Sequence, residues 1–298
     1  MSLQNGFIEK VKNKPFLSED EEPAFTLEKN DSSVIFTGPH NGIAVPKCLP
    51  AYLGMDKDWF LKAHESHDLH AAELFDVLKK TIPDANYVMG NYSRLVTDLN
   101  LIADAAITSN SSEYGDKIKI AGNLNLSVKE MHSRIKSIHW PYHDAIEDLI
   151  KETRMKHGGI IKLDIHSFSP VWQGKKDRDD VEISTIRCES TPFSLAFEDF
   201  IQRDNAPYIF KSGKPYKIAD RLNNAAHNVQ DRNKIQYLGI EIRSDLINTI
   251  EKQQKMASYL ASAMDYVLSR PNIKEIIAPW ESNTDYKKPE QSMTDVWM

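Results

Sequence analysis

Hydrophobic and polar positions form blocks along the chain, and these blocks predict strands and helices in turn. Short apolar runs bounded by turn residues predict buried strands at residues 32–42, 85–90, 159–170, 181–186 and 236–243. Longer segments with apolar residues at helical spacing predict helices at residues 57–80, 127–157, 191–204, 216–231 and 245–270. The second of these helices is expected to be interrupted or kinked at Trp140-Pro141. Alternating strands and helices indicate an α/β fold with a central sheet.

Two regions depart from this alternation. Residues 1–30 are polar and strongly acidic around positions 18–23, which predicts an arm packed on the surface. Residues 31–298 contain no linker, so we expect one α/β domain whose central mixed, largely parallel sheet is flanked by helices. Within it, residues 103–124 lack strong periodicity and carry Ser, Asn and Gly. They are expected to form a long excursion that shapes a pocket.

Composition narrows the possible partners and the compartment. The net charge of −6 leaves no basic footprint, which argues against nucleic acid or an anionic membrane as a partner. Cys48 and Cys188 form no CxxC pair and are too few for a disulfide framework, so they are read as thiols in a reducing compartment. No apolar run is long enough to span a bilayer, and no signal peptide is present. We therefore expect a cytoplasmic protein.

Two histidines follow directly on predicted buried strands. His40 lies in a Gly-Pro-His-Asn-Gly turn, and His166 leads into a turn marked by Ser167 and Pro170. Ligands of open α/β sheets sit beyond the carboxyl ends of the strands. If the two strands are neighbours, both imidazoles can converge on one metal ion. Catalytic zinc typically takes three protein ligands, so one more donor is needed.

The segment HESHDLH (64–70) offers that third donor. On the predicted helix, His64 and Asp68 share a face, as do Glu65 and Asp68. Asp68 is the preferred ligand because its face continues into small residues that let the helix approach the sheet, and Glu65 is the second choice. Two alternatives remain: a metal-binding pair of His67 and His70, or a solvated helix face.

A carboxylate interrupts the last apolar strand. Glu241 lies within LGIEIRSD (238–245), where a buried carboxylate is costly unless it is paired or functional. Because strands alternate faces, Glu241 and Arg243 project to the same side. They form either a buried ion pair or a functional set. In the functional reading, Glu241 is a general base beside a metal-activated water, and Arg243 binds a substrate anion.

The run NYSRLVTDLN (91–100) and the tripeptide PYH (141–143) add polar candidates. Arg94 offers the planar fork that grips a carboxylate, and Asn100 could complete a clamp for an anion and an amide. His143 could form a polar wall of the same pocket. The alternatives are a surface cation at Arg94 and a helix N-terminus packed by its aromatic residues at 142–143.

Taken together, these segments resemble the N-formylglutamate amidohydrolase family. The matching blocks occur in the family's order and are GPHNG, HESHDLHAAELF, YSRLVTDLN, PYH, DIHSFSPV, DNAPY (204–208) and GIEIRSDLI. The family is similar in turn to the zinc carboxypeptidases, where a His-Ser dipeptide after a strand supplies a zinc ligand and a later strand Glu is the base. The resemblance implies a mixed sheet between helical layers, zinc at His40 and His166, and Glu241 as the base.

The chain departs from these patterns in three places. Carboxypeptidases usually carry Glu three residues after the first zinc histidine, where this chain has Ile43, so the third ligand comes from elsewhere. Members of the formylglutamate family often have Glu-Asn after that histidine, whereas this chain has Asn41-Gly42. They also commonly have Arg after the DLN run, where this chain has Leu101. The last change concerns the substrate more than the reaction.

The sequence thus predicts a zinc-dependent amidohydrolase with one divalent ion per chain. Its substrate would be a small anionic N-acyl amino acid such as N-formyl-L-glutamate, cleaved to formate and glutamate. His40, Asp68 and His166 would hold the metal, and Glu241 would be the base. Arg94, Asn100, His143 and Arg243 would bind substrate or stabilise the oxyanion. The alternatives are a metallo-carboxypeptidase, a deacylase for another acyl group, or a non-catalytic binding protein that keeps the fold.

Overall fold

The computed structural model describes residues 16–111, 118–171, 178–186, 190–203, 206–216 and 235–278. Within these residues, seven strands form one mixed sheet in the order β1-β3-β2-β6-β9-β7-β8. The strands are β1 (Phe25–Glu28), β2 (Val34–Gly38), β3 (Asn86–Gly90), β6 (Ile160–Phe168), β7 (Ile183–Ile186), β8 (Phe210–Ser212) and β9 (Ile235–Arg243). The four strands β3, β2, β6 and β9 run parallel, while β1 is antiparallel to β3 and β7 is antiparallel to β9. The predicted mixed, largely parallel sheet is confirmed.

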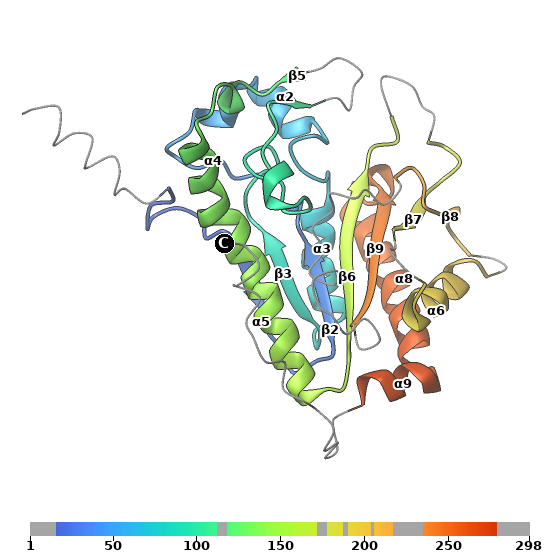
Figure 1. Ribbon diagram of the computed structural model, residues 1–298. Helices are drawn as coiled ribbons and strands as arrows, with labels where there is room; N and C mark the ends of the chain where they lie inside the picture. Colours follow the sequence, from blue (N-terminus) through green and yellow to red (C-terminus); the bar gives the residue numbers. More distant parts are fainter. Residues whose placement is uncertain are drawn as a thin grey trace, which may run out of the picture.

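Helices cover both faces of this sheet (Figure 1). The helices are α2 (Lys57–Lys62), α3 (Ala71–Thr81), α4 (Val128–Arg134), α5 (Trp140–Lys156), α6 (Pro192–Ile201), α8 (Ile250–Leu268) and α9 (Pro271–Ile277). Side chains of α3, α6 and α8 pack in one apolar core, and side chains of α5 pack in a second core on the other face. The chain is therefore a single α/β domain with its sheet between two helical layers.

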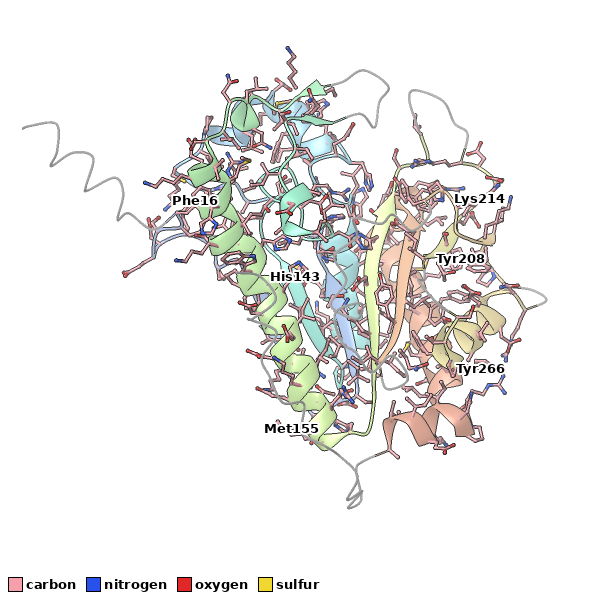
Figure 2. The ribbon with its side chains drawn as sticks, in the orientation of Figure 1. Phe16, His143, Met155, Tyr208, Lys214 and Tyr266 are labelled. Carbon is pink, nitrogen blue, oxygen red and sulfur yellow. The ribbon has the colours of Figure 1, made fainter. Side chains whose placement is uncertain are left out.

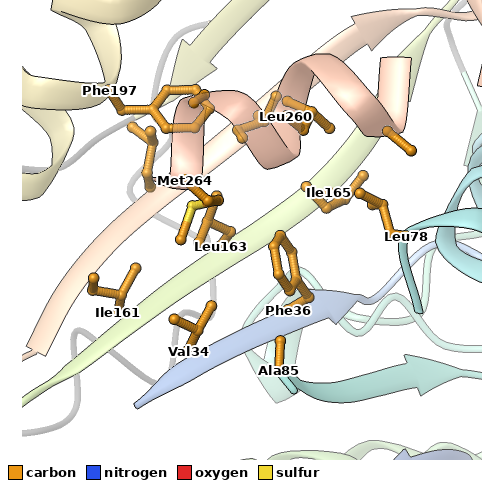
Figure 3. Packing of buried hydrophobic residues seen from close by; sticks show 14 of the residues in the cluster. Val34, Phe36, Leu78, Ala85, Ile161, Leu163, Ile165, Phe197, Leu260 and Met264 are labelled. Atoms are coloured by element: carbon orange, nitrogen blue, oxygen red, sulfur yellow. The ribbon is translucent and has the colours of Figure 1, made fainter. Parts of the chain in front are cut away.

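The central strand β6 joins the two cores. Ile161, Leu163 and Ile165 point into the core with α3, α6 and α8 (Figure 3), whereas Ile160 packs in the core with α5. All four side chains are buried, and each burial stabilises the fold by about 25 cal/mol per Å² of apolar surface. This two-sided burial explains why the segment is a near-continuous apolar run.

The helix predicted over residues 57–80 is wrong in its middle. The structure has α2 at Lys57–Lys62 and α3 at Ala71–Thr81, with an irregular turn over residues 63–70 between them. Ser66 Oγ donates to Ala63 O at 2.8 Å, and His70, at φ 65°, adopts a left-handed conformation at the start of α3. Polar side chains of the turn compete with helical hydrogen bonds, and tertiary contacts use them instead.

The helix predicted over residues 127–157 is close to the observed structure. It consists of α4, a π-helical segment η4 (Ile135–His139) and α5, so the interruption precedes Pro141 as a π-helix. The strand predictions at β2, β3, β6, β7 and β9 and the helices α6 and α8 are confirmed within a few residues at each end. The helix predicted at 216–231 and Cys188 lie outside the described residues, apart from Tyr216.

Two further regions acquire structure that the pattern did not show. Within the arm, residues 1–15 lie outside the described residues, but Phe25–Glu28 forms the edge strand β1. Residues 103–124 contain the short helices η2 (Ala103–Ala105) and η3 (Ala121–Asn123) and a ribbon of β4 (Asn110–Ser111) with β5 (Ile118–Lys119). No helix in the described ranges is long and apolar enough to cross a membrane.

Candidate metal centre and active site

Three predicted ligands meet where the parallel strands end. His40 follows β2, His166 lies near the end of β6, and Asp68 comes from the turn between α2 and α3. One ligand atom from each lies within 4.8 Å of the other two, and all three residues are buried. The structure therefore brings together the preferred set of metal ligands.

Asp68 reaches the cluster because residues 63–70 form an irregular turn between α2 and α3 instead of continuing the helix. Its backbone N–H donates to His40 O at 2.9 Å, which ties the turn to the end of β2. Its carboxylate Oδ2 accepts from Ser167 N at 3.1 Å and lies 3.0 Å from His166 Nδ1. Its other oxygen lies 3.7 Å from His40 Nδ1. One carboxylate thus links both histidines.

His40 is oriented by a second carboxylate. His40 Nε2 lies 2.7 Å from Asp98 Oδ1, so Nε2 carries the proton and Nδ1 keeps its lone pair. Nδ1 is buried and has no hydrogen-bond partner in the part of the chain that the structure describes. A buried acceptor without a donor is costly, and a cation facing Nδ1 would remove that cost. The donor set of two imidazoles and a carboxylate fits zinc.

Both imidazoles have the charge state that metal binding requires. Burial is the largest cause that lowers the pKa of His40, to about 3, and the nearby Arg94 charge adds to it. Burial also lowers the pKa of His166. Burial by itself would raise the pKa of Asp98, but the charge and hydrogen bond of His40 outweigh it and lower that pKa to about 2. The histidines are neutral near pH 7, as ligands must be.

Glu241 lies beside the cluster on the neighbouring strand. In the parallel pairing of β6 with β9, its backbone partner is His166, so both side chains project from the same face of the sheet. Glu241 is buried, as is Ser184, its partner on β7. A carboxylate is thereby positioned one strand away from a predicted metal ligand.

Arg94 also reaches the cluster, where its Nη2 contacts Asp68 Oδ1. Its Nε is buried and has no hydrogen-bond partner among the described residues, so this guanidinium retains a donor. Asn100 lies nearby, and its backbone N–H donates to Asp98 Oδ1 at 2.8 Å. Arg94, Asp98 and Asn100 therefore form one polar segment along the metal-ligand cluster.

The other two predicted binding residues are His143 on α5 and Arg243 at the end of β9. His143 lies on α5 (labelled in Figure 2) and lines a small pocket together with Lys162 and Asp164 of β6. Burial is the largest cause that lowers its pKa to about 3. The Arg243 guanidinium donates to Asp245 at 2.8 Å and lies 3.4 Å from Glu182. The charge of Arg243 is thus already balanced.

The alternative ligands do not join the cluster. Glu65 is buried in the same turn as Asp68 but is not one of the three residues whose ligand atoms converge. His67 Nδ1 lies 2.8 Å from Ser66 Oγ, and His70 begins α3, so these two do not form a metal pair with the cluster.

Sequence reasoning assigned no role to two residues that contact the ligands. Asp98 bonds to His40, and His64 Nε2 lies 3.6 Å from Asp68 Oδ1. The sequence signal for Asp98 was a lone carboxylate within the apolar run 95–99. His64 was visible only as a neighbour of Asp68 on a helix that does not form there.

Comparison with known proteins bears on the same residues. The family model of N-formylglutamate amidohydrolase matches residues 32–248, a span that contains every predicted ligand and Glu241. The fold is similar to a crystal structure of gene product Atu2144 from Agrobacterium tumefaciens, with 25% identity, a TM-score of 0.74, and coverage of 85% of this chain and 98% of that chain. It is also similar to a crystal structure of N-formylglutamate amidohydrolase from Ralstonia eutropha JMP134, with 17% identity and a TM-score of 0.58, covering 85% and 96%.

No curated protein gives a significant match. The family model nevertheless covers well over half of the 298 residues, and it spans both the sheet core and the buried His-Asp-His cluster. The chain belongs to the N-formylglutamate amidohydrolase family.

Proposed function

We propose that this chain is a zinc-dependent hydrolase that cleaves the amide bond of a small N-acyl amino acid, with a formyl group as the acyl part. The observation that carries the proposal is the convergence of His40, Asp68 and His166, with Glu241 on the strand next to His166. Family membership supports hydrolysis of an amide. The choice of an N-formyl amino acid as the substrate also rests on membership of this family.

Each residue of the site has a distinct role in this proposal. His40, Asp68 and His166 would hold one zinc ion, which lowers the pKa of a water molecule and polarises the acyl carbonyl. Glu241 accepts the proton of the attacking water and then delivers it to the leaving nitrogen. Arg94 binds the substrate carboxylate or the developing oxyanion through its remaining donors.

The electrostatics of the site support these roles. Asp68 neutralises Arg94 in the absence of metal, because their side chains are in contact. When a divalent cation takes the Asp68 carboxylate, the guanidinium is left to bind an anion. Asn100, held through its backbone by Asp98, adds a neutral amide beside the same segment. The same arrangement suits substrates that carry one carboxylate near the scissile amide.

The Glu241→Gln variant tests the role of the base. It keeps the shape of the side chain but removes the basic oxygen, so formate release from N-formyl amino acids should fall by at least about 10³-fold. Zinc content, measured by elemental analysis of the purified protein, should stay at about one ion per chain. Both quantities are measured on the same preparation.

The matched control is Glu251→Gln, the same change at an exposed position at the start of α8, which should leave both quantities unchanged. Normal turnover in Glu241→Gln would contradict the assignment of the base. A wild-type protein that binds no zinc and does not recover activity when zinc is added would instead favour a non-catalytic binding protein.

A further inference from the structure

Asp68 differs from the other two proposed metal ligands in how its backbone is held. His166 is part of β6 and His40 closely follows β2, whereas Asp68 belongs to the irregular turn over residues 63–70. A strand is fixed by the hydrogen bonds of its sheet, but an irregular turn is fixed by its individual contacts. The position of the Asp68 carboxylate therefore depends on the groups that bond to this turn.

The hydroxyl group of Ser93 holds the turn on one side of Asp68. Ser93 follows β3, and its Oγ donates to Ser66 O at 2.6 Å. The same Oγ accepts from Leu95 N at 3.2 Å, so its own hydrogen is left to bond to Ser66 O. Ser93 and Ser66 are both fully buried, and a buried carbonyl that loses its donor is costly. This bond therefore fixes the turn just before Asp68.

Ser167 of β6 holds the turn on the other side. Its Oγ donates to Leu69 O at 2.8 Å, and its backbone N–H donates to Asp68 Oδ2 at 3.1 Å. Ser167 is buried and directly follows His166 in the chain. One serine thus fixes both the backbone next to Asp68 and the carboxylate itself.

Together these bonds attach the turn to three adjacent strand ends. Ser93 comes after β3, Ser167 lies near the end of β6, and β2 lies between these two strands in the sheet. The residue that follows β2 takes part as well, because His40 O accepts from Asp68 N at 2.9 Å. That last bond joins two backbone groups. The two serine hydroxyls are the side-chain groups whose loss a substitution can measure.

We propose that Ser93 and Ser167 are positioning residues of the metal site, which set the affinity and the coordination geometry of the bound ion by holding Asp68. The inference rests on the metal site of the proposed function, and it does not depend on the substrate. Both serines act through the turn. Removing a group that orients a metal ligand typically weakens metal binding by about 10–100-fold.

The Ser167→Ala and Ser93→Ala variants each remove one hydroxyl donor and leave Asp68 in place. Each should bind zinc at least about tenfold more weakly than the wild type, measured in competition against a chelator of known affinity. Ser167→Thr and Ser93→Thr keep a hydroxyl group and should recover most of the lost affinity. Urea denaturation of the same preparations shows that each variant is folded.

The matched control is Ser194→Ala. Ser194 is also fully buried, and its Oγ donates to Thr191 O at 3.1 Å at the start of α6. The variant loses the same kind of bond, so its stability should fall to a similar extent, while its zinc affinity should equal that of the wild type. A general loss of stability is thereby separated from a loss of ligand position.

A double variant tests whether Ser167 acts through Asp68. In an Asp68→Asn background the third ligand is already impaired, so adding Ser167→Ala should have almost no further effect on zinc affinity. Cobalt gives a second readout, because its visible absorption depends on the number and arrangement of its ligands. The cobalt spectrum should change in Ser167→Ala and Ser93→Ala but not in Ser194→Ala.

The outcomes separate this inference from the proposed function. Wild-type zinc affinity and an unchanged cobalt spectrum in both Ser93→Ala and Ser167→Ala would overturn the inference, as would an equal effect of Ser167→Ala in both backgrounds. A protein that binds zinc but releases no formate would contradict the proposed hydrolysis and leave the inference standing. A wild-type protein that binds neither zinc nor cobalt would overturn the metal site and the inference together.

Discussion

Asp98 orients one of the three residues of the proposed metal site. Its hydrogen bond to His40 Nε2 fixes the tautomer, so the lone pair on Nδ1 faces Asp68. Asp98 is itself held by the backbone N–H of Asn100 at 2.8 Å. Carboxylates in this position orient ligating histidines and raise their basicity. Asp98, which positions His40, therefore lies in the same short segment as Arg94 and Asn100, the candidates for substrate binding.

The Asp98→Asn variant tests this role at the scale of one residue. The amide is a weaker acceptor than the carboxylate, so zinc affinity should fall by about 10–100-fold. Competition against a chelator of known affinity measures the change. Asp104→Asn, an exposed change in the short helix η2, should leave the affinity unaffected. An affinity for zinc in Asp98→Asn equal to that of the wild type would show that His40 is oriented by other contacts.

At the scale of elements, the turn after β2 is locked against the segment that follows β3. Ala44 N donates to Asn91 O at 3.1 Å, and Ser93 N donates to Ala44 O at 3.0 Å. Gly42 makes this approach possible, because a Cβ there would lie 2.1 Å from the backbone carbonyl carbon of Asn91. The contact couples the His40 turn to the segment that carries Arg94.

The Gly42→Ala variant should therefore destabilise the fold and the site together. The added methyl group forces two backbone segments apart, at a cost of about 1–3 kcal/mol in the free energy of unfolding. Urea denaturation measures this loss, and zinc competition measures the accompanying loss of affinity. An unchanged denaturation midpoint would show that the two segments can separate without cost.

At the scale of the whole molecule, the chain buries several histidines in neutral form. Burial is the largest cause in each case, and it lowers the pKa of His40 and His143 to about 3 and that of His67 to about 4. In the unfolded chain a histidine titrates at about 6.5. Between these values the unfolded state binds more protons than the folded state.

The stability of the metal-free protein should therefore depend on pH in this window. The contribution of these neutral histidines to the free energy of unfolding is fully present above about pH 6.5. It is lost progressively as the pH falls toward about 3–4, because unfolding then takes up protons. Urea midpoints measured from about pH 7 to about pH 4 test this trend. His143→Gln should make the slope shallower, since one buried titrating group is removed. A midpoint that stays constant over this range would contradict the neutral state of these histidines.

Much of the fold was predictable because its signals are local. The apolar runs at β2, β3, β6 and β9 reflect burial on both faces, which a sequence records directly. The turn over residues 63–70 was not predictable, because hydrogen bonds with segments far away in the sequence stabilise it. Ser66 and Asp68 bond there to groups outside any local helix, among them Ser167 N.

The sequence by itself determined the chemistry available at the site. Histidines after two strands, a carboxylate within a third and an arginine in a polar run name the donors, because side-chain chemistry belongs to each residue. Only the tertiary structure decided which donors meet. Asp68 joins His40 and His166 because the chain leaves the helical path, and Asp164 neutralises Lys162 because both project from one face of β6. Such convergence depends on distances between segments far apart in the chain, and no local pattern encodes those distances.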